Sequence, residues 1–198
     1  MIPRLLVTVG MACALFGSVS TAAAHPDIAV SVRLTFAMES TRLIGFSQRL
    51  VFDAATSRRL LGRFDADHDG TLSSTEFDAL AAEILPRLSE RNAYTELTLD
   101  HRSLPVPDPA VSELRLHEGY LELGLDFRFA EAPDLHAATL GMLMRDRDLV
   151  IAFRPDPATL AIIAPDNKDG CVTGVEQRPD LAYFGGLVTP SVVTLSCK

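Results

Sequence analysis

Residues 65–76 carry the side chains whose types and spacing most clearly predict chemistry. Carboxylates stand at positions 1, 3, 5 and 12 of this segment, and a glycine stands at position 6. The order matches the D-x-[DN]-x-[DN]-G-x5-E pattern of an EF-hand loop, in which oxygens surround a calcium ion. The predicted ligands are the carboxylates of Asp65, Asp67 and Asp69, the backbone carbonyl of Thr71, the Ser73 hydroxyl directly or through water, and both oxygens of Glu76.

Two properties of the segment favour calcium over a solvated acidic turn or a magnesium site. The apolar Leu72 stands at position 8, where such a loop packs against its domain. Glu76 can bind with both oxygens, which the strict octahedron of magnesium tolerates poorly. Residues 165–176 have a similar spacing, but Pro165 occupies the first ligand position. A single loop indicates a structural or modest-affinity site rather than a calmodulin-like switch, and we expect the ion mainly to fix the local fold.

The histidines offer at most one further candidate site, which would bind a transition metal. No pair has the H-E-x-x-H spacing of a zinc site, and His68 lies at an outward position of the loop. His25 is different, because signal-peptide cleavage would place it first in the mature chain. Its α-amine and imidazole together would form a chelate for copper, nickel or zinc.

The helices that must position the loop follow from a repeat of three and four residues. Leu60, Leu61 and Phe64 precede the loop in this phase, and Phe77, Leu80, Ala81 and Ile84 follow it. We therefore expect an EF-hand over about residues 54–90, with Pro86 limiting the second helix.

Strand patterns surround this helical segment. Alternating apolar residues predict a strand over 28–38 and a second strand from 44 to 52, which together form a hairpin. Strands are also expected near residues 121–129, 149–153, 172–175 and 192–195, whereas residues 105–109 and 155–157 read as connections. The predicted fold class is α+β: a mostly antiparallel, β-sandwich-like domain with an inserted helix–calcium loop–helix.

The N-terminal segment and the two late cysteines predict an exported protein. Arg4, an apolar run and Ala22-Ala23-Ala24 form a signal peptide over residues 1–24, which leaves one domain over residues 25–198. Cys171 and Cys197 then remain and are expected to form a disulfide, since their spacing is unlike that of a redox or metal C-x-x-C pair. The net charge of −8 argues against nucleic-acid partners.

The chain resembles a family of uncharacterised periplasmic proteins, labelled as a domain of unknown function or as a periplasmic component of an ABC-type transport system. The resemblance rests on the His25-Pro26 start, a first hairpin ending at Phe52-Asp53, the acidic loop 65–76 and the late cysteine pair. Genes of this family often lie beside nickel, cobalt or zinc transporters. This chain has Asp27 where the family typically has a second histidine, which weakens the case for a metal site at the mature start.

Two functions are therefore expected. The first is a periplasmic calcium-binding accessory to a membrane transporter of divalent metals, which the resemblance implies. The second is a periplasmic binding or interaction module in which calcium is purely structural. The sequence has no G-x-S-x-G motif, phased Cys/His pair or glycine-rich phosphate loop, so neither an enzyme nor a small-molecule substrate is predicted.

Overall fold

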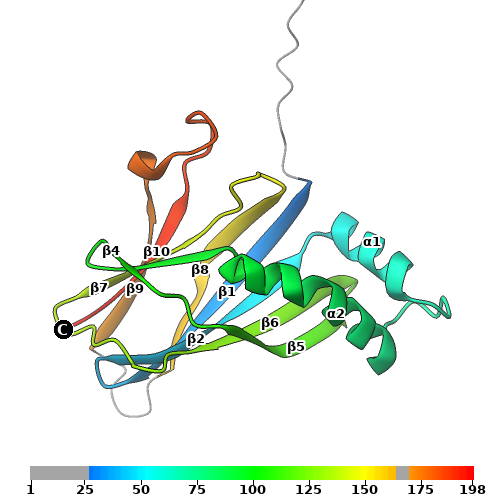
Figure 1. The fold of residues 1–198 in the computed structure, drawn as a ribbon, viewed down its shortest axis with the longest axis horizontal. Helices are drawn as coiled ribbons and strands as arrows, with labels where there is room; N and C mark the ends of the chain where they lie inside the picture. Colours follow the sequence, from blue (N-terminus) through cyan, green and yellow to red (C-terminus); the bar gives the residue numbers. More distant parts are fainter. Residues whose placement is uncertain (1–26, 164–169) are drawn as a thin grey trace, which may run out of the picture.

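The computed structural model describes residues 27–163 and 170–198 and has an α+β architecture (Figure 1). Within these residues there are two five-stranded sheets and two α-helices. The predicted signal peptide and His25 lie outside the described residues, so both remain predictions.

Sheet A contains the first hairpin and has the strand order β5-β6-β2-β1-β8. Four of its strands pair antiparallel, while β8 runs parallel to β1. Burial along β1 alternates as the apolar pattern predicts, with Val32, Leu34 and Phe36 buried and Ser31 and Arg33 exposed. The strands are β1 (Ile28–Glu39), β2 (Arg42–Phe52), β5 (Pro109–His117), β6 (Tyr120–Arg128) and β8 (Ile151–Ile163).

Sheet B is assembled from strands between residues 95 and 197 and is antiparallel, in the order β4-β3-β7-β10-β9. Its strands are β3 (Thr95–Leu99), β4 (Arg102–Leu104), β7 (Thr139–Met144), β9 (Cys171–Gln177) and β10 (Ser191–Cys197). The 3-10 turns Asn92–Tyr94 and Pro179–Leu181 precede β3 and follow β9. The expected disulfide is confirmed: Cys171 pairs with Cys197 across β9 and β10.

One apolar core joins the two sheets. Side chains from β1 and β6, such as Phe36 and Leu125, belong to the same buried cluster as Met142 of β7 and Leu195 of β10. The removal of this apolar surface from water is the main force that holds the sheets together. The described residues thus form a mostly β, α+β structure of two sheets, as predicted.

The two helices lie beside sheet A; α1 lies at the end of the molecule away from sheet B, and α2 runs back toward β3 of sheet B (Figure 1). Helix α1 spans Ala54–Phe64 and α2 spans Ser74–Glu90, in agreement with the predicted range 54–90. A second cluster centred on Leu72, Leu80 and Leu121 packs them against β6. In the described part of the chain, no helix is long and apolar enough to cross a membrane.

Two expectations about element boundaries were wrong. Pro86 lies inside α2, which continues to Glu90; the ring removes the hydrogen bond to the Ala82 carbonyl without ending the helix. Residues 155–157 lie within β8 rather than in a connection. The pairing of β8 with β1 shifts register there, between Pro155 and Leu160, and β8 is an edge strand, where proline is tolerated.

Candidate metal site in the loop 65–76

The acidic loop is held at both ends by helix termini. Asp65 caps the C-terminus of α1, and its backbone N–H donates to the Leu61 carbonyl. Ser73 caps the N-terminus of α2 through a capping box, in which the Ser73 hydroxyl accepts from the Glu76 amide and the Glu76 carboxylate accepts from the Ser73 amide. The first and last predicted ligands therefore belong to the rigid ends of the two helices.

An apolar contact fixes the middle of the loop to the sheet. Leu72 is only 8 % exposed and packs with Leu80 of α2 and Leu121 of β6, as its predicted packing role requires. The first helix is fixed separately, because the buried Ser57 hydroxyl accepts a hydrogen bond from the Leu121 amide at 3.0 Å. Both helices thus meet the same residue of β6.

Three of the six predicted ligands converge. Asp65, Asp67 and Glu76 each place a carboxylate oxygen within 4.8 Å of the others. Asp65 is buried, Glu76 is half-buried and Asp67 is exposed, so one side of the trio is open to solvent. Within residues 27–163 and 170–198, this is the only group of three or more His, Cys, Asp or Glu side chains with that closeness.

The remaining predicted ligands line the same loop but are engaged in local hydrogen bonds. Asp69 accepts from both the amide and the hydroxyl of Thr71 at 2.8 Å. The Ser73 hydroxyl donates to Glu76 Oε2, also at 2.8 Å. Calcium ligation stays a prediction for all six residues, and for Asp69, Thr71 and Ser73 it is based on loop position alone.

The turn itself depends on Gly70. This residue has φ +83°, in the left-handed region that side chains disfavour, and its amide donates to Asp65 Oδ2 at 2.9 Å. His68 also has a positive φ, of 59°, and its side chain is exposed, as expected for an outward loop position. The sharp turn brings the Asp65 carboxylate under the loop.

The electrostatics of the trio are those of crowded carboxylates. The Asp69 amide lowers the pKa of Asp67, but slight desolvation, the charge of Asp69, the hydrogen bond with Asp65 and the charge of Glu76 outweigh it, so the pKa of Asp67 is raised. The pKa of Glu76 is lowered, first by the Ser73 amide and hydroxyl and then by the Ala66 amide. Glu76 is therefore held in its charged form, while Asp67 is charged at the expense of repulsion that a cation would relieve.

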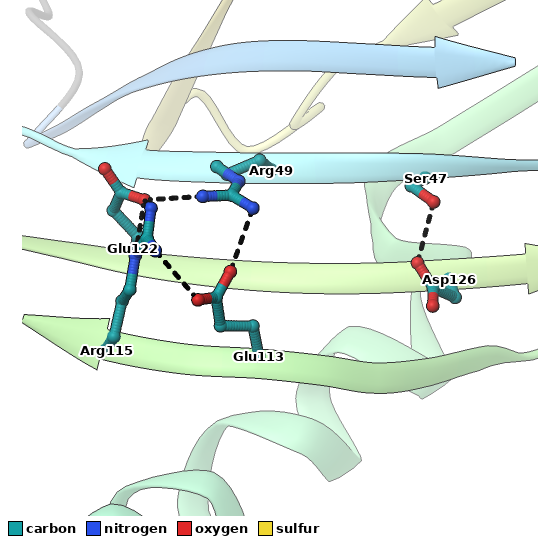
Figure 2. A network of polar contacts seen from close by, with 6 residues as sticks. All are labelled: Ser47, Arg49, Glu113, Arg115, Glu122 and Asp126. Atoms are coloured by element: carbon teal, nitrogen blue, oxygen red, sulfur yellow. Dashed lines mark hydrogen bonds and ion pairs between the residues drawn. The ribbon is translucent and has the colours of Figure 1, made fainter. Parts of the chain in front are cut away.

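Other charged clusters were not predicted from the sequence. On the face of sheet A turned away from the core, Arg49 and Arg115 both contact Glu122, and each also contacts Glu113 (Figure 2). The side chain of Glu122 is 4 % exposed, and it lies between the core residues Leu121 and Leu123 in sequence. Glu122 stands at a polar position of the alternating pattern in β6, so no sequence signal indicates its burial, and its arginine partners come from two other strands.

The described residues provide no further ligand group for the predicted transition-metal site at His25. His101, His117 and His136 belong to no metal-ligand group among the described residues, and His25 lies outside them. His101 lies in the turn between β3 and β4, and His117 ends β5.

The comparisons with known proteins give a family but no function. The family model described as "Protein of unknown function (DUF1007)" matches residues 10–182. No curated protein matches the chain.

Proposed function

Because this chain belongs to the DUF1007 family of unknown function, we propose its function from the loop: it is a periplasmic calcium-binding protein. The observation that carries the proposal is the convergence of Asp65, Asp67 and Glu76 within 4.8 Å, between two helices and around the turn at Gly70. Oxygen ligands of this kind suit a hard cation, and the loop length and order suit calcium.

The donor set fits the ion. Asp65, Asp67 and Glu76 would hold calcium first, joined by Asp69, the Thr71 carbonyl and Ser73 as the loop pattern predicts. The ion supplies positive charge where the pKa of Asp67 is raised by its neighbours. It would also link the end of α1 to the start of α2, because Asp65 and Glu76 belong to those termini.

The packing of the loop supports a structural role for calcium. In a paired EF-hand the second hand supports the loop, whereas here Leu72 packs on Leu80 and Leu121 of the same domain. With an affinity of about 10⁻⁴–10⁻³ M, millimolar calcium adds only about 0.4–1.4 kcal/mol of stability. That gain corresponds to a rise in melting temperature of about 1–5 °C for a domain of this size.

A calcium titration followed by thermal unfolding tests the proposal. We expect the melting temperature to rise with calcium and far less with magnesium. Glu76→Gln should abolish the rise, whereas Asp78→Asn, which removes a charge from an exposed position of the same helix, should leave it unchanged. Equal responses of the two variants would show nonspecific screening, and a protein that ignores calcium would refute the proposal.

The wider role rests on the family resemblance and on His25. We propose that the protein is an accessory to a membrane transporter of divalent metals, with binding-module function as the alternative. Titration calorimetry with Zn²⁺, Ni²⁺ and Cu²⁺ on the processed protein separates the two. A site lost in His25→Ala supports the accessory role; binding of calcium alone favours the module in which calcium is structural.

A further inference from the structure

A second candidate site lies in a polar groove on sheet B. The groove has a volume of about 810 Å³ and lies between β3, the β4–β5 connection and the segment that follows β7. We propose that it binds a small ligand bearing carboxylate or phosphate groups. The proposal is independent of calcium, since no residue of the loop 65–76 lines the groove.

Two arginines are fixed on one wall by a shared carboxylate. Arg145 binds Glu96 through two parallel hydrogen bonds of 2.9 and 2.8 Å, and Arg147 binds the same carboxylate at 3.0 Å. Arg147 is nevertheless 72 % exposed, and in the described structure only its Nη2 is engaged. Its Nε and Nη1 donors have no hydrogen-bond partner among the described residues.

A third arginine approaches from the end of α2. Arg91 uses Nη1 to contact Asp148 at 2.8 Å and Asp146 at 3.5 Å. Its guanidinium lies 5.6 Å from the Tyr94 ring centre, which orients the plane of the group. The buried Asp146 also accepts from three backbone amides, those of Asp148, Val150 and Ile151, which hold its charged oxygens in place beside Arg91.

The balance of charge in the groove departs from that of the whole molecule. Three arginines line it, and they contact three carboxylates, those of Glu96, Asp146 and Asp148, so this cluster is locally neutral. The chain as a whole has a net charge of −8. A locally neutral cluster with exposed guanidinium donors makes this groove a more favourable place for an anion than the rest of a strongly acidic molecule.

The turn that follows Arg91 has a strained backbone. Asn92, Ala93 and Tyr94 have φ of 49°, 49° and 57°, three consecutive side-chain-bearing residues in the left-handed region. Such strain persists only where the surroundings enforce it, and it concentrates at functional sites. Here the strained turn places Arg91 and Tyr94 at the groove, and the Tyr94 carbonyl accepts from the Arg145 amide at 3.0 Å.

The other lining residues indicate which chemical groups the ligand would carry. Thr98 and Ser103 supply hydroxyls, and Leu104 and Val106 supply a short apolar wall. Guanidinium groups pair with carboxylates and phosphates through parallel hydrogen bonds, and the volume is that of a small-molecule site. A compact ligand with more than one oxyanion could contact Arg91 and Arg147 together.

Titration calorimetry at constant ionic strength tests this site. Citrate represents the carboxylate source and inorganic phosphate the other, with chloride as the screening control. We expect saturable binding of one of the two anions, weakened about tenfold or more in Arg147→Gln through the loss of charged hydrogen bonds. Arg58→Gln, an exposed position on α1 outside the groove, should change the affinity by less than about twofold.

The outcomes separate clearly. Tighter citrate binding assigns a carboxylate ligand, and tighter phosphate binding assigns a phosphate-bearing one. Arg91→Gln gives a second, independent variant in the groove, should Arg147→Gln alter the fold as judged by circular dichroism. Absence of saturable binding for both anions, or equal weakening by Arg58→Gln, overturns the proposal.

Discussion

The carboxylates of the acidic loop already accept backbone hydrogen bonds, and this decides how a cation would meet them. Asp65 accepts from the amides of Asp69 and Gly70, and Glu76 accepts from the amides of Ala66 and Ser73. These bonds hold the oxygens close together before any ion arrives. They also satisfy part of each carboxylate's capacity, so the gain on binding calcium is smaller than for free carboxylates, in keeping with a modest affinity.

Gly70→Ala should weaken both the fold of the loop and calcium binding. A methyl group would meet no atom within 4 Å, but φ +83° disfavours any side chain. We expect a loss of about 1–2 kcal/mol in the free energy of unfolding, measured with urea.

Gly62→Ala is the matched control for this substitution. Gly62 lies within α1, and a methyl group there also meets nothing within 4 Å. Alanine in a helix should stabilise the protein by about 0.5–1 kcal/mol. Similar effects of the two substitutions would contradict the conformational explanation and indicate a general sensitivity of the helix pair.

Contacts between residues close together in the sequence could be predicted, whereas contacts between distant residues could not. The convergence of Asp65, Asp67 and Glu76 was predictable because their spacing alone brings them together within one short loop. Gln48 interrupts the apolar pattern of its strand, yet it is buried and donates to Thr95 Oγ1 at 2.8 Å. Its partner lies 47 residues away, and no local pattern announces such a contact.

At the scale of elements, the joint between sheet A and α1 determines where the loop lies. Asp53 caps α1 by accepting from the Thr56 amide, and its other oxygen accepts from the Ala29 amide of β1, both at 2.8 Å. One carboxylate therefore connects the first strand to the first helix. Burial raises the pKa of Asp53, but the hydrogen bonds from Thr56 and Ala29 outweigh it and leave that pKa lowered.

Asp53→Ala should destabilise the protein by about 1–2 kcal/mol at pH 7, the usual effect of losing an N-cap. A lowered pKa in the folded state means that the stabilisation by the charged form is present above the unfolded value, about 3.9. It is lost as the pH falls through the lowered folded value. Urea unfolding at pH 7 and at successively lower pH should therefore show the difference from wild type shrinking below about pH 4.

Asp53→Asn separates the cap from its charge. The amide oxygen still caps the helix, so Asp53→Asn should lose less stability at pH 7 than Asp53→Ala does. The difference between the Asn and Ala variants should not change with pH, since neither side chain titrates. A wild-type advantage over Asp53→Ala that stayed constant down to pH 2 would contradict the assigned role of the charge.

Element types were more predictable than their limits and partners. The alternation in β1 and the helical repeat around the loop are strong local signals, and both elements formed as expected. The helical continuation through Pro86 and the strand through Pro155 were not predictable. Beyond Pro86 the helix continues because Leu88 packs against the core, and β8 tolerates Pro155 because it is an edge strand. The parallel pairing of β8 with β1 joins segments more than a hundred residues apart and leaves no periodic signature.

Over the whole molecule, the acidic loop and the disulfide stabilise separate regions. The helix pair lies beside sheet A, whereas Cys171 and Cys197 belong to β9 and β10 of sheet B (Figure 1). The polar groove uses β3 of sheet B and shares no lining residue with either feature. The two proposed binding sites and the covalent link can therefore be perturbed one at a time.

Replacing both cysteines by alanine should lower stability without changing calcium affinity. The link closes 26 residues of chain, and the chain-entropy relation then gives a loss of about 3.5 kcal/mol. The melting temperature should fall by about 7–14 °C. Reduction of the wild-type protein with dithiothreitol provides the control and should reproduce the shift. Calorimetry on the double variant should return a calcium dissociation constant within about twofold of wild type, because sheet A and the helices keep their own packing. A parallel loss of calcium affinity would show instead that the two sheets communicate through the shared core.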